Sequence, residues 1–181
     1  MSADNLTEKK LSSEQIYKGR IVTLSVDTVE LPNGKTSKRE LVQHPGAVAM
    51  VPVDAQGNII MVRQFRYAAN QILLELPAGT LNRDEAPDVC AARELQEETG
   101  YKATALTKLG GIFVAPGSST EFIHLYLATG LTESRLAMDE DEFIEVAHYP
   151  LQTLLDQVYS GEITDGKTVA GLVLAQKRLG R

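Results

Sequence analysis

Apolar and polar residues alternate in the N-terminal part of the chain. From Tyr17 to residue 31 apolar side chains recur among polar ones, and Pro32-Asn33-Gly34 then marks a tight turn. Residues 36–43 have the pattern of a returning strand, so we expect a β-hairpin region over residues 14–43. Residues 1–13 are polar and predict a flexible arm. Because isolated hairpins are marginally stable in water, the hairpin should pack on the main domain or on a second subunit.

Nearly continuous apolar runs follow and indicate buried strands. The runs at 47–53 and 59–62, with turn residues between them, predict a central hairpin whose first strand is covered on both faces. Residues 72–76 predict a strand that leads into turn residues at 77–79. Further strands are expected from the alternating pattern of residues 102–113, 122–128 and 145–149.

One helix is predicted between Pro87 and Gly100. Proline suits the first position of a helix, and glycine suits the left-handed residue that ends it. Val89, Ala92 and Leu95, spaced by three, predict the buried stripe of this helix. Its glutamates are therefore expected to face a surface or a cleft.

The C-terminal part of the chain predicts two more helices, over residues 151–158 and 165–177, with Gly161 between them. In the first, leucine and valine have the spacing of one buried face. We expect these helices to pack on the sheet without taking part in chemistry. The sequence shows no repeat and no linker after the hairpin, so residues 44–181 are expected to form one domain.

Composition and charge narrow the class of protein. The chain has 181 residues and 43% hydrophobic content, enough for one globular domain. Its 18 Lys+Arg and 24 Asp+Glu give a net charge of −6, which argues against binding nucleic acid or membranes through a broad positive surface. Cys90, the one cysteine, is expected to be a small buried residue. We see no signal or spanning segment and expect a cytoplasmic protein.

Three glutamates stand where local energetics disfavours them. Glu94 lies one helical turn from Glu97 and Glu98, and each such pair repels by about 0.2–0.5 kcal/mol. Glu97 and Glu98 also fall in the last turn, where the helix dipole disfavours a carboxylate by about 0.3–1 kcal/mol. A segment that breaks two local rules is a candidate functional site. We hypothesise that divalent cations provide the compensating interaction.

The spacing of this stretch resembles a known pattern. The order is Gly79, five residues, Glu85, seven residues, Arg93-Glu94-Leu95, one residue, Glu97-Glu98, one residue, Gly100. It resembles the Nudix box of hydrolases that cleave nucleoside diphosphates linked to another group. Tyr101 follows where this family more often has an aliphatic residue, which is a packing position.

Other features resemble the ADP-ribose pyrophosphatase branch of the Nudix family. They are LPAG at 76–79, Pro116 sixteen residues after Gly100, and the acidic run at 139–146. The resemblance implies an α/β/α sandwich with a mixed sheet for residues 44–181, plus a small N-terminal antiparallel sheet. It also implies a homodimer that shares this N-terminal sheet.

The resemblance implies roles for the acidic residues and for the arginine of the box. Glu94, Glu97 and Glu98 would hold Mg²⁺ or Mn²⁺, with the backbone carbonyl of Ala78 or Gly79 as a further ligand and Glu85 in support. Arg93 would fix orientation by pairing with Glu85 or with another box carboxylate. The general base would come from the loop at 139–142, with Glu142 the first choice and Glu140 the second.

Substrate contacts are expected before and after the box. Arg63, Phe65, Arg66 and Glu75 are candidates by position, since guanidinium groups bind phosphate and a ring can stack on a base. The simpler alternative is an edge strand with solvated charges. Pro116 is a candidate for substrate specificity, because it resembles the proline that marks the ADP-ribose pyrophosphatase branch.

The function implied is hydrolysis of ADP-ribose to AMP and ribose 5-phosphate, in which a metal-activated water attacks a phosphorus atom. One alternative is the same chemistry on another nucleoside diphosphate sugar. Another is a non-catalytic sensor of ADP-ribose, for which we would expect a degraded box or an attached DNA-binding domain. The sequence shows neither feature.

Overall fold

The computed structural model of the chain describes residues 6–134, 136–137 and 143–180. The chain divides into two compact units. The N-terminal unit comprises residues 1–45 and 113–121, and the main unit comprises residues 46–112 and 122–181. None of the helices that the structure describes combines the length and the hydropathy needed to cross a lipid bilayer.

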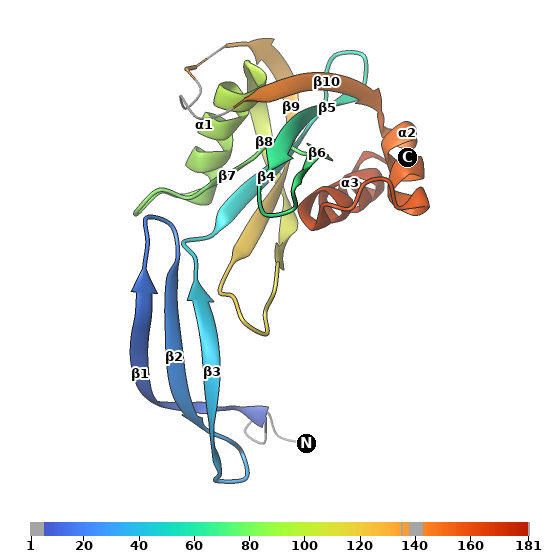
Figure 1. The fold of residues 1–181 in the computed structure, drawn as a ribbon. Coiled ribbons are helices and arrows are strands. Elements are labelled where there is room, and N and C mark those ends of the chain that lie inside the picture. Colours follow the sequence, from blue (N-terminus) through green and yellow to red (C-terminus); the bar gives the residue numbers. More distant parts are fainter. Residues whose placement is uncertain (1–5, 135, 138–142, 181) are drawn as a thin grey trace. The chain divides into compact units, whose positions relative to one another are not determined.

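A three-stranded antiparallel sheet forms the N-terminal unit, in the order β1 (Lys9–Lys18), β2 (Thr23–Glu30) and β3 (Thr36–Gln43) (Figure 1). The predicted turn joins β2 to β3, and Gly34 there has a φ of 80°, which favours glycine. The predicted flexible arm is wrong for residues 9–13, because they belong to β1. Their partners are polar, since Ser13 Oγ donates a hydrogen bond to buried Asp27 and Lys10 Nζ lies 3.1 Å from the same carboxylate.

Residues 113–121 complete the N-terminal unit. The Val42 N–H donates to the Ser118 carbonyl (2.8 Å), and the Thr120 N–H donates to the Val42 carbonyl (3.0 Å). Pro116 lies in the exposed turn of this segment. The segment is therefore held to β3 by main-chain hydrogen bonds.

The main unit contains two sheets. One is a mixed sheet in the order β7-β4-β9-β8, in which β4 is parallel to β9 and antiparallel to β7. The other is antiparallel, in the order β10-β5-β6. The strands are β4 (Ala47–Pro52), β5 (Asn58–Arg66), β6 (Gln71–Glu75), β7 (Ala78–Thr80), β8 (Tyr101–Phe113), β9 (Phe122–Glu133) and β10 (Ile144–Pro150).

Helices cover both faces of the mixed sheet. Within the main unit, α1 (Pro87–Thr99) lies on one side, and α2 (Leu151–Ser160) and α3 (Gly166–Leu179) lie on the other (Figure 1). In β4, Val48 and Met50 pack in the core cluster that contains α1 residues, while Val51 packs in the cluster of α2 and α3. This confirms a strand covered on both faces and explains its continuous apolar run. The predicted α/β/α arrangement with a mixed sheet is confirmed.

The predicted central hairpin between β4 and β5 is wrong. The two strands belong to different sheets, and a single isolated bridge joins Val53, directly after β4, to Ile59 of β5. The physical reason is that β9 and β7 occupy both hydrogen-bonding edges of β4. The short strand β7 takes one of these edges, at a place where the sequence predicted only a turn.

Candidate active site

The inner face of α1 carries carboxylates as well as apolar side chains. The helix begins at Pro87 and ends before Gly100, whose φ of 76° is left-handed, as the sequence predicted. The predicted buried stripe is confirmed for Leu95, which is fully buried, but is wrong for Val89, which is 58% exposed. The glutamates are expected to face a surface or a cleft, and an open surface is wrong for two of them, since Glu94 and Glu98 are only 7% and 4% exposed.

The two buried glutamates lie against the main chain of β7. The Ala78 N–H donates a hydrogen bond to Glu98 Oε2 at 3.0 Å. A Cβ atom added to Gly79 would lie 1.8 Å from the Cδ atom of Glu94, so the carboxylate fills the space that any side chain at this position would need. The segment predicted to offer a carbonyl ligand thus adjoins two of the predicted metal ligands.

Arg93 ties three box carboxylates together. Its Nε and Nη2 atoms donate to the two oxygens of Glu85 at 2.9 and 3.0 Å, which confirms the predicted pairing. Its Nη1 atom donates to Glu94 Oε1 and to Glu97 Oε2, both at 2.7 Å. The positive charge of Arg93 therefore offsets the repulsion between Glu94 and Glu97 within the box itself.

The ionisation of these groups follows from their contacts. Hydrogen bonds from Arg93 lower the pKa of Glu85 to about 2. The same hydrogen bonds to Glu85 raise the pKa of Arg93. Burial raises the pKa of the Cys90 thiol to about 12, so Cys90 is a neutral core residue at physiological pH. The prediction of a small buried cysteine is confirmed.

A second group of charges lies at the ends of β5 and β6. Glu75 is fully buried, and Arg66 Nε and Nη2 donate to its two oxygens at 2.9 and 2.7 Å. Lys167, at the start of α3, donates to Glu75 Oε2 as well. Burial raises the pKa of Glu75, but Arg66 and Lys167 outweigh this effect and hold it below its ordinary value. Two predicted substrate contacts therefore bind each other, and Lys167 is a partner that the sequence did not indicate.

Comparison with known families identifies this arrangement. Residues 43–171 match the family described as "NUDIX domain", a range that includes all of α1 and the LPAG segment. The chain belongs to the Nudix family. Residues 8–42 match a second family, described as "Nucleoside diphosphate sugar hydrolase N-terminal domain".

Individual Nudix relatives cover nearly the whole chain. An ADP-ribose pyrophosphatase of Bacillus subtilis is 46% identical over 95% of this chain and 94% of its own length. A methanol dehydrogenase activator of Bacillus methanolicus is 44% identical, with 93% of this chain and 92% of the relative covered. An ADP-ribose pyrophosphatase of Mycobacterium tuberculosis is 41% identical, with 90% and 80% covered.

A solved structure agrees with the Nudix fold of the chain. It is described as the crystal structure of an ADP compounds hydrolase. Its TM-score is 0.85, with 24% sequence identity, 97% of this chain covered and 96% of the other. At 24% identity this structural similarity supports the fold of the chain and carries no conclusion about its substrate.

The Nudix carboxylates fit a hard divalent cation by their chemistry. Among the described residues, no three or more His, Cys, Asp or Glu side chains already stand in a metal-binding arrangement. Arg93 holds one oxygen each of Glu94 and Glu97. A carboxylate has two oxygens and about four lone-pair sites, so it can keep one contact and still ligate. Carboxylate and carbonyl oxygens are the ligands that hard cations prefer.

The remaining predicted residues belong to other elements of the chain or lie outside its described part. Arg63 and Phe65 are exposed on β5, and Arg63 lies 3.7 Å from Glu145 of β10. Pro116 belongs to the N-terminal unit. Their substrate roles stay predictions. The two candidate bases, Glu140 and Glu142, lie outside the described residues.

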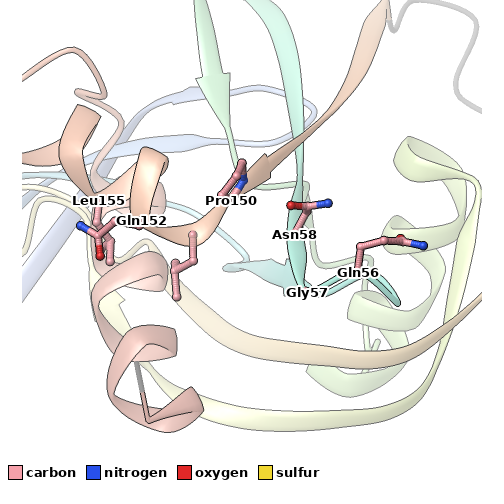
Figure 2. Close-up of a pocket in the computed structure, with 7 residues that line it drawn as sticks. Gln56, Gly57, Asn58, Pro150, Gln152 and Leu155 are labelled. Atoms are coloured by element: carbon pink, nitrogen blue, oxygen red, sulfur yellow. The ribbon is translucent and has the colours of Figure 1, made fainter.

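A depression of about 290 Å³ lies at the opposite end of β5 from Arg66. Figure 2 shows its lining from the turn before β5, the end of β10 and the start of α2. None of the lining side chains is titratable, so the depression lacks the chemistry of the carboxylate cluster. The residues are Gln56, Gly57, Asn58, Pro150, Leu151, Gln152 and Leu155.

Proposed function

We propose that the protein hydrolyses the pyrophosphate bond of ADP-ribose to give AMP and ribose 5-phosphate. The observation that carries the proposal is the intact Nudix box, with Glu94 and Glu98 buried against Ala78 and Gly79. The ADP-ribose pyrophosphatases at 46% and 41% identity support this choice of substrate. The water oxygen bonds to one phosphorus atom and the bond from that phosphorus to the bridging oxygen breaks. The other phosphate leaves with the bridging oxygen, and the protons of the water pass to the loop base and to solvent.

The box residues prepare a site for Mg²⁺ or Mn²⁺. When bound, the cation supplies charge neutralisation on the pyrophosphate and activation of the attacking water. Arg93 keeps the carboxylates of Glu94 and Glu97 oriented while it remains anchored to Glu85 by two hydrogen bonds. The Ala78 N–H holds the carboxylate of Glu98. A glutamate of the loop at 139–142 would take the proton from the attacking water. Glu142 is the first choice for this base and Glu140 the second.

Arg66 is the candidate phosphate contact of the second group. Its side chain is 39% exposed, although its guanidinium also pairs with buried Glu75. A guanidinium has five N–H donors, so Arg66 can hold Glu75 and still donate to a phosphate oxygen.

Two other functions have a specific observation in their favour. The match of residues 8–42 to a nucleoside diphosphate sugar hydrolase family favours another sugar nucleotide as substrate. The 44% identity to a methanol dehydrogenase activator favours an effect on a dehydrogenase. An unchanged methanol dehydrogenase rate after addition of this protein would count against the latter. A non-catalytic sensor is disfavoured by the intact box.

A substrate panel with Mg²⁺ tests the proposed hydrolysis. Wild-type protein should cleave ADP-ribose in preference to other nucleoside diphosphate sugars, and chelation of the cation should abolish cleavage. Glu98→Gln should lose activity, whereas Glu162→Gln, at an exposed position, should retain it. Cleavage of no nucleoside diphosphate derivative, or full activity of Glu98→Gln, would contradict the proposal.

We also propose that the protein is a cytoplasmic homodimer. The exposed apolar side chains of the N-terminal sheet support self-association. The single cysteine, buried and unpaired with another cysteine, suits a reducing compartment.

A further inference from the structure

The first turn of α3 contacts the segment that leads to Ala78. Thr168 is fully buried, and its Oγ1 accepts a hydrogen bond from the Leu76 N–H at 2.8 Å. The same hydroxyl donates to Asp165 Oδ2, and Asp165 also caps the helix by accepting from the Thr168 N–H at 3.0 Å. Thr168 therefore links the capped start of α3 to the main chain two residues before Ala78.

Hydrogen bonds hold the main chain from Leu76 to Ala78 at successive residues. The Thr168 hydroxyl binds the Leu76 N–H, the Met50 N–H donates to the Pro77 carbonyl at 2.9 Å, and the Ala78 N–H donates to Glu98. The fixed φ of Pro77 removes one of the backbone rotations between the first and the last of these contacts. A displacement at Leu76 would therefore move the carbonyl and the N–H of Ala78.

Close packing strengthens the link between α3 and this segment. A Cβ atom on Gly171, one turn after Thr168, would lie 2.4 Å from Leu76 Cδ1. Leu76 is fully buried between the helix and the sheet. The helix thus contacts Leu76 through both a hydrogen bond and its side chain.

Lys167, the neighbour of Thr168, acts on the other side of the site. Its Nζ contacts Glu75 Oε2 and lies 3.0 Å from Asp165 Oδ2, and its side chain is nearly buried. Glu75 in turn holds one edge of the Arg66 guanidinium, through Nε and Nη2. The pKa of Arg66 is raised first by its hydrogen bond to Glu75 and further by the charge of Glu98. Arg66 therefore shares the electrostatic environment of the box carboxylates.

We propose that Thr168 and Lys167 are positioning residues for the hydrolysis. This inference rests on the proposed function. Thr168 fixes the main chain up to Ala78, and the Ala78 N–H holds the carboxylate of Glu98. Thr168 therefore acts on the part of the site that would bind the cation. Lys167 fixes Glu75, which orients Arg66, so it acts on the phosphate side. The first turn of α3 thereby positions both the cation-binding and the phosphate-binding parts of the site.

Thr168→Val tests the cation side, because valine keeps the shape and removes the hydroxyl. We expect the Mg²⁺ concentration for half-maximal rate to rise by roughly 3- to 10-fold, less than the 10- to 100-fold effect of losing a partner bonded directly to a metal ligand, because Thr168 acts through the main chain of residues 76–78. The KM for ADP-ribose at saturating Mg²⁺ should change little. Thr168→Ser restores a hydroxyl and should return the Mg²⁺ dependence to that of the wild type. An unchanged Mg²⁺ dependence in Thr168→Val would overturn this role.

Lys167→Met tests the phosphate side. Loss of its charge removes one positive group from the network that Arg66 presents to phosphate. We expect the KM for ADP-ribose to rise by about 10-fold with kcat nearly unchanged, as when an interaction common to ground and transition states is lost. The Mg²⁺ dependence should stay close to that of the wild type. An unchanged KM would overturn the role of Lys167.

Two controls separate positioning from stability and from the proposed function. Ala175→Gly lowers the stability of the same helix away from the network. It should leave the Mg²⁺ concentration for half-maximal rate and the KM for ADP-ribose unchanged, because a smaller folded fraction alters only the apparent kcat. Mn²⁺ binding without substrate, followed by electron paramagnetic resonance, should be weaker in Thr168→Val than in the wild type. Equal Mn²⁺ binding in an active wild type and in Thr168→Val would overturn the positioning role of Thr168 and leave the proposed hydrolysis standing. Absence of Mn²⁺ binding by the wild type would overturn both the proposed cation site and this inference.

Discussion

Gly79 is the position at which the carboxylate cluster leaves no room for a side chain. In Gly79→Ala, the new Cβ would overlap the carboxylate of Glu94, which must then move and weaken its hydrogen bond from Arg93. We expect kcat for ADP-ribose to fall by about 100-fold, since a displacement near 1 Å has this effect. Gly117→Ala, where a Cβ meets nothing within 4 Å, is the matched control and should keep wild-type kcat.

Glu85 makes stability depend on pH through its pair with Arg93. Its pKa lies near 2 in the folded chain, below about 4.3 in an unfolded one. The pair therefore stabilises the fold above pH 4.3, by about 1–2 kcal/mol, and this contribution is lost as the pH falls toward 2. Urea unfolding of the wild type and Glu85→Gln should show a difference at pH 7 that shrinks by pH 3. A difference that grows at low pH would contradict the prediction.

Cys90 should be unreactive in the folded protein. Burial raises the pKa of its thiol to about 12, so very little thiolate is present at pH 8. We expect a colorimetric disulfide reagent to leave native protein unmodified for hours and to titrate one thiol after denaturation in guanidinium chloride. Rapid reaction of the native protein would show that α1 opens locally.

At the scale of elements, α1 should respond to core substitutions on the face that carries the glutamates. Leu95 is fully buried on that face, whereas Val89 is exposed. Leu95→Ala should lower the free energy of unfolding by about 2–4 kcal/mol, and Val89→Ala by less than about 0.5 kcal/mol. Urea unfolding of the two variants compares them directly, and similar losses would contradict the observed orientation of α1.

The limits of α1 could be predicted from the sequence, but its orientation could not. Pro87 and Gly100 act through local backbone geometry, which the sequence displays. The buried face depends on contacts of Glu94 and Glu98 with β7, a strand of three residues that forms only because β4 pairs with it. Two carboxylates on the inner face interrupt the apolar spacing, and the remaining apolar pattern therefore predicts, wrongly, that Val89 belongs to the buried stripe.

Part of the candidate site could likewise be predicted. The resemblance to the Nudix box implies that Arg93 pairs with Glu85 or with another box carboxylate, and it binds Glu85 eight residues away. The contacts of Lys167 with Glu75 and of Thr168 with Leu76 each span 92 residues and depend on how α3 packs on the sheet. Asp165 could be recognised as a helix cap, but a cap signal does not reveal which strand the helix start will meet.

At the scale of the whole molecule, the N-terminal sheet bears on the proposed homodimer. All ten residues of β1 are exposed, and apolar side chains such as Ile16 and Tyr17 are among them. An exposed edge strand with apolar side chains favours pairing with another chain, and a three-stranded sheet gains stability from a packed face. We therefore expect the second copy to cover β1.

Ile16→Lys tests this interface, because a charge at an exposed position leaves the fold of one chain intact but disfavours burial against another. Light scattering at micromolar concentration should give a dimer mass for the wild type and a monomer mass for Ile16→Lys, with equal circular dichroism. Gln15→Lys adds the same charge at the neighbouring exposed position of β1 and should shift the mass less, since it removes no apolar side chain. A monomeric wild type would contradict the dimer, and a dimeric Ile16→Lys would contradict burial of Ile16 in the interface.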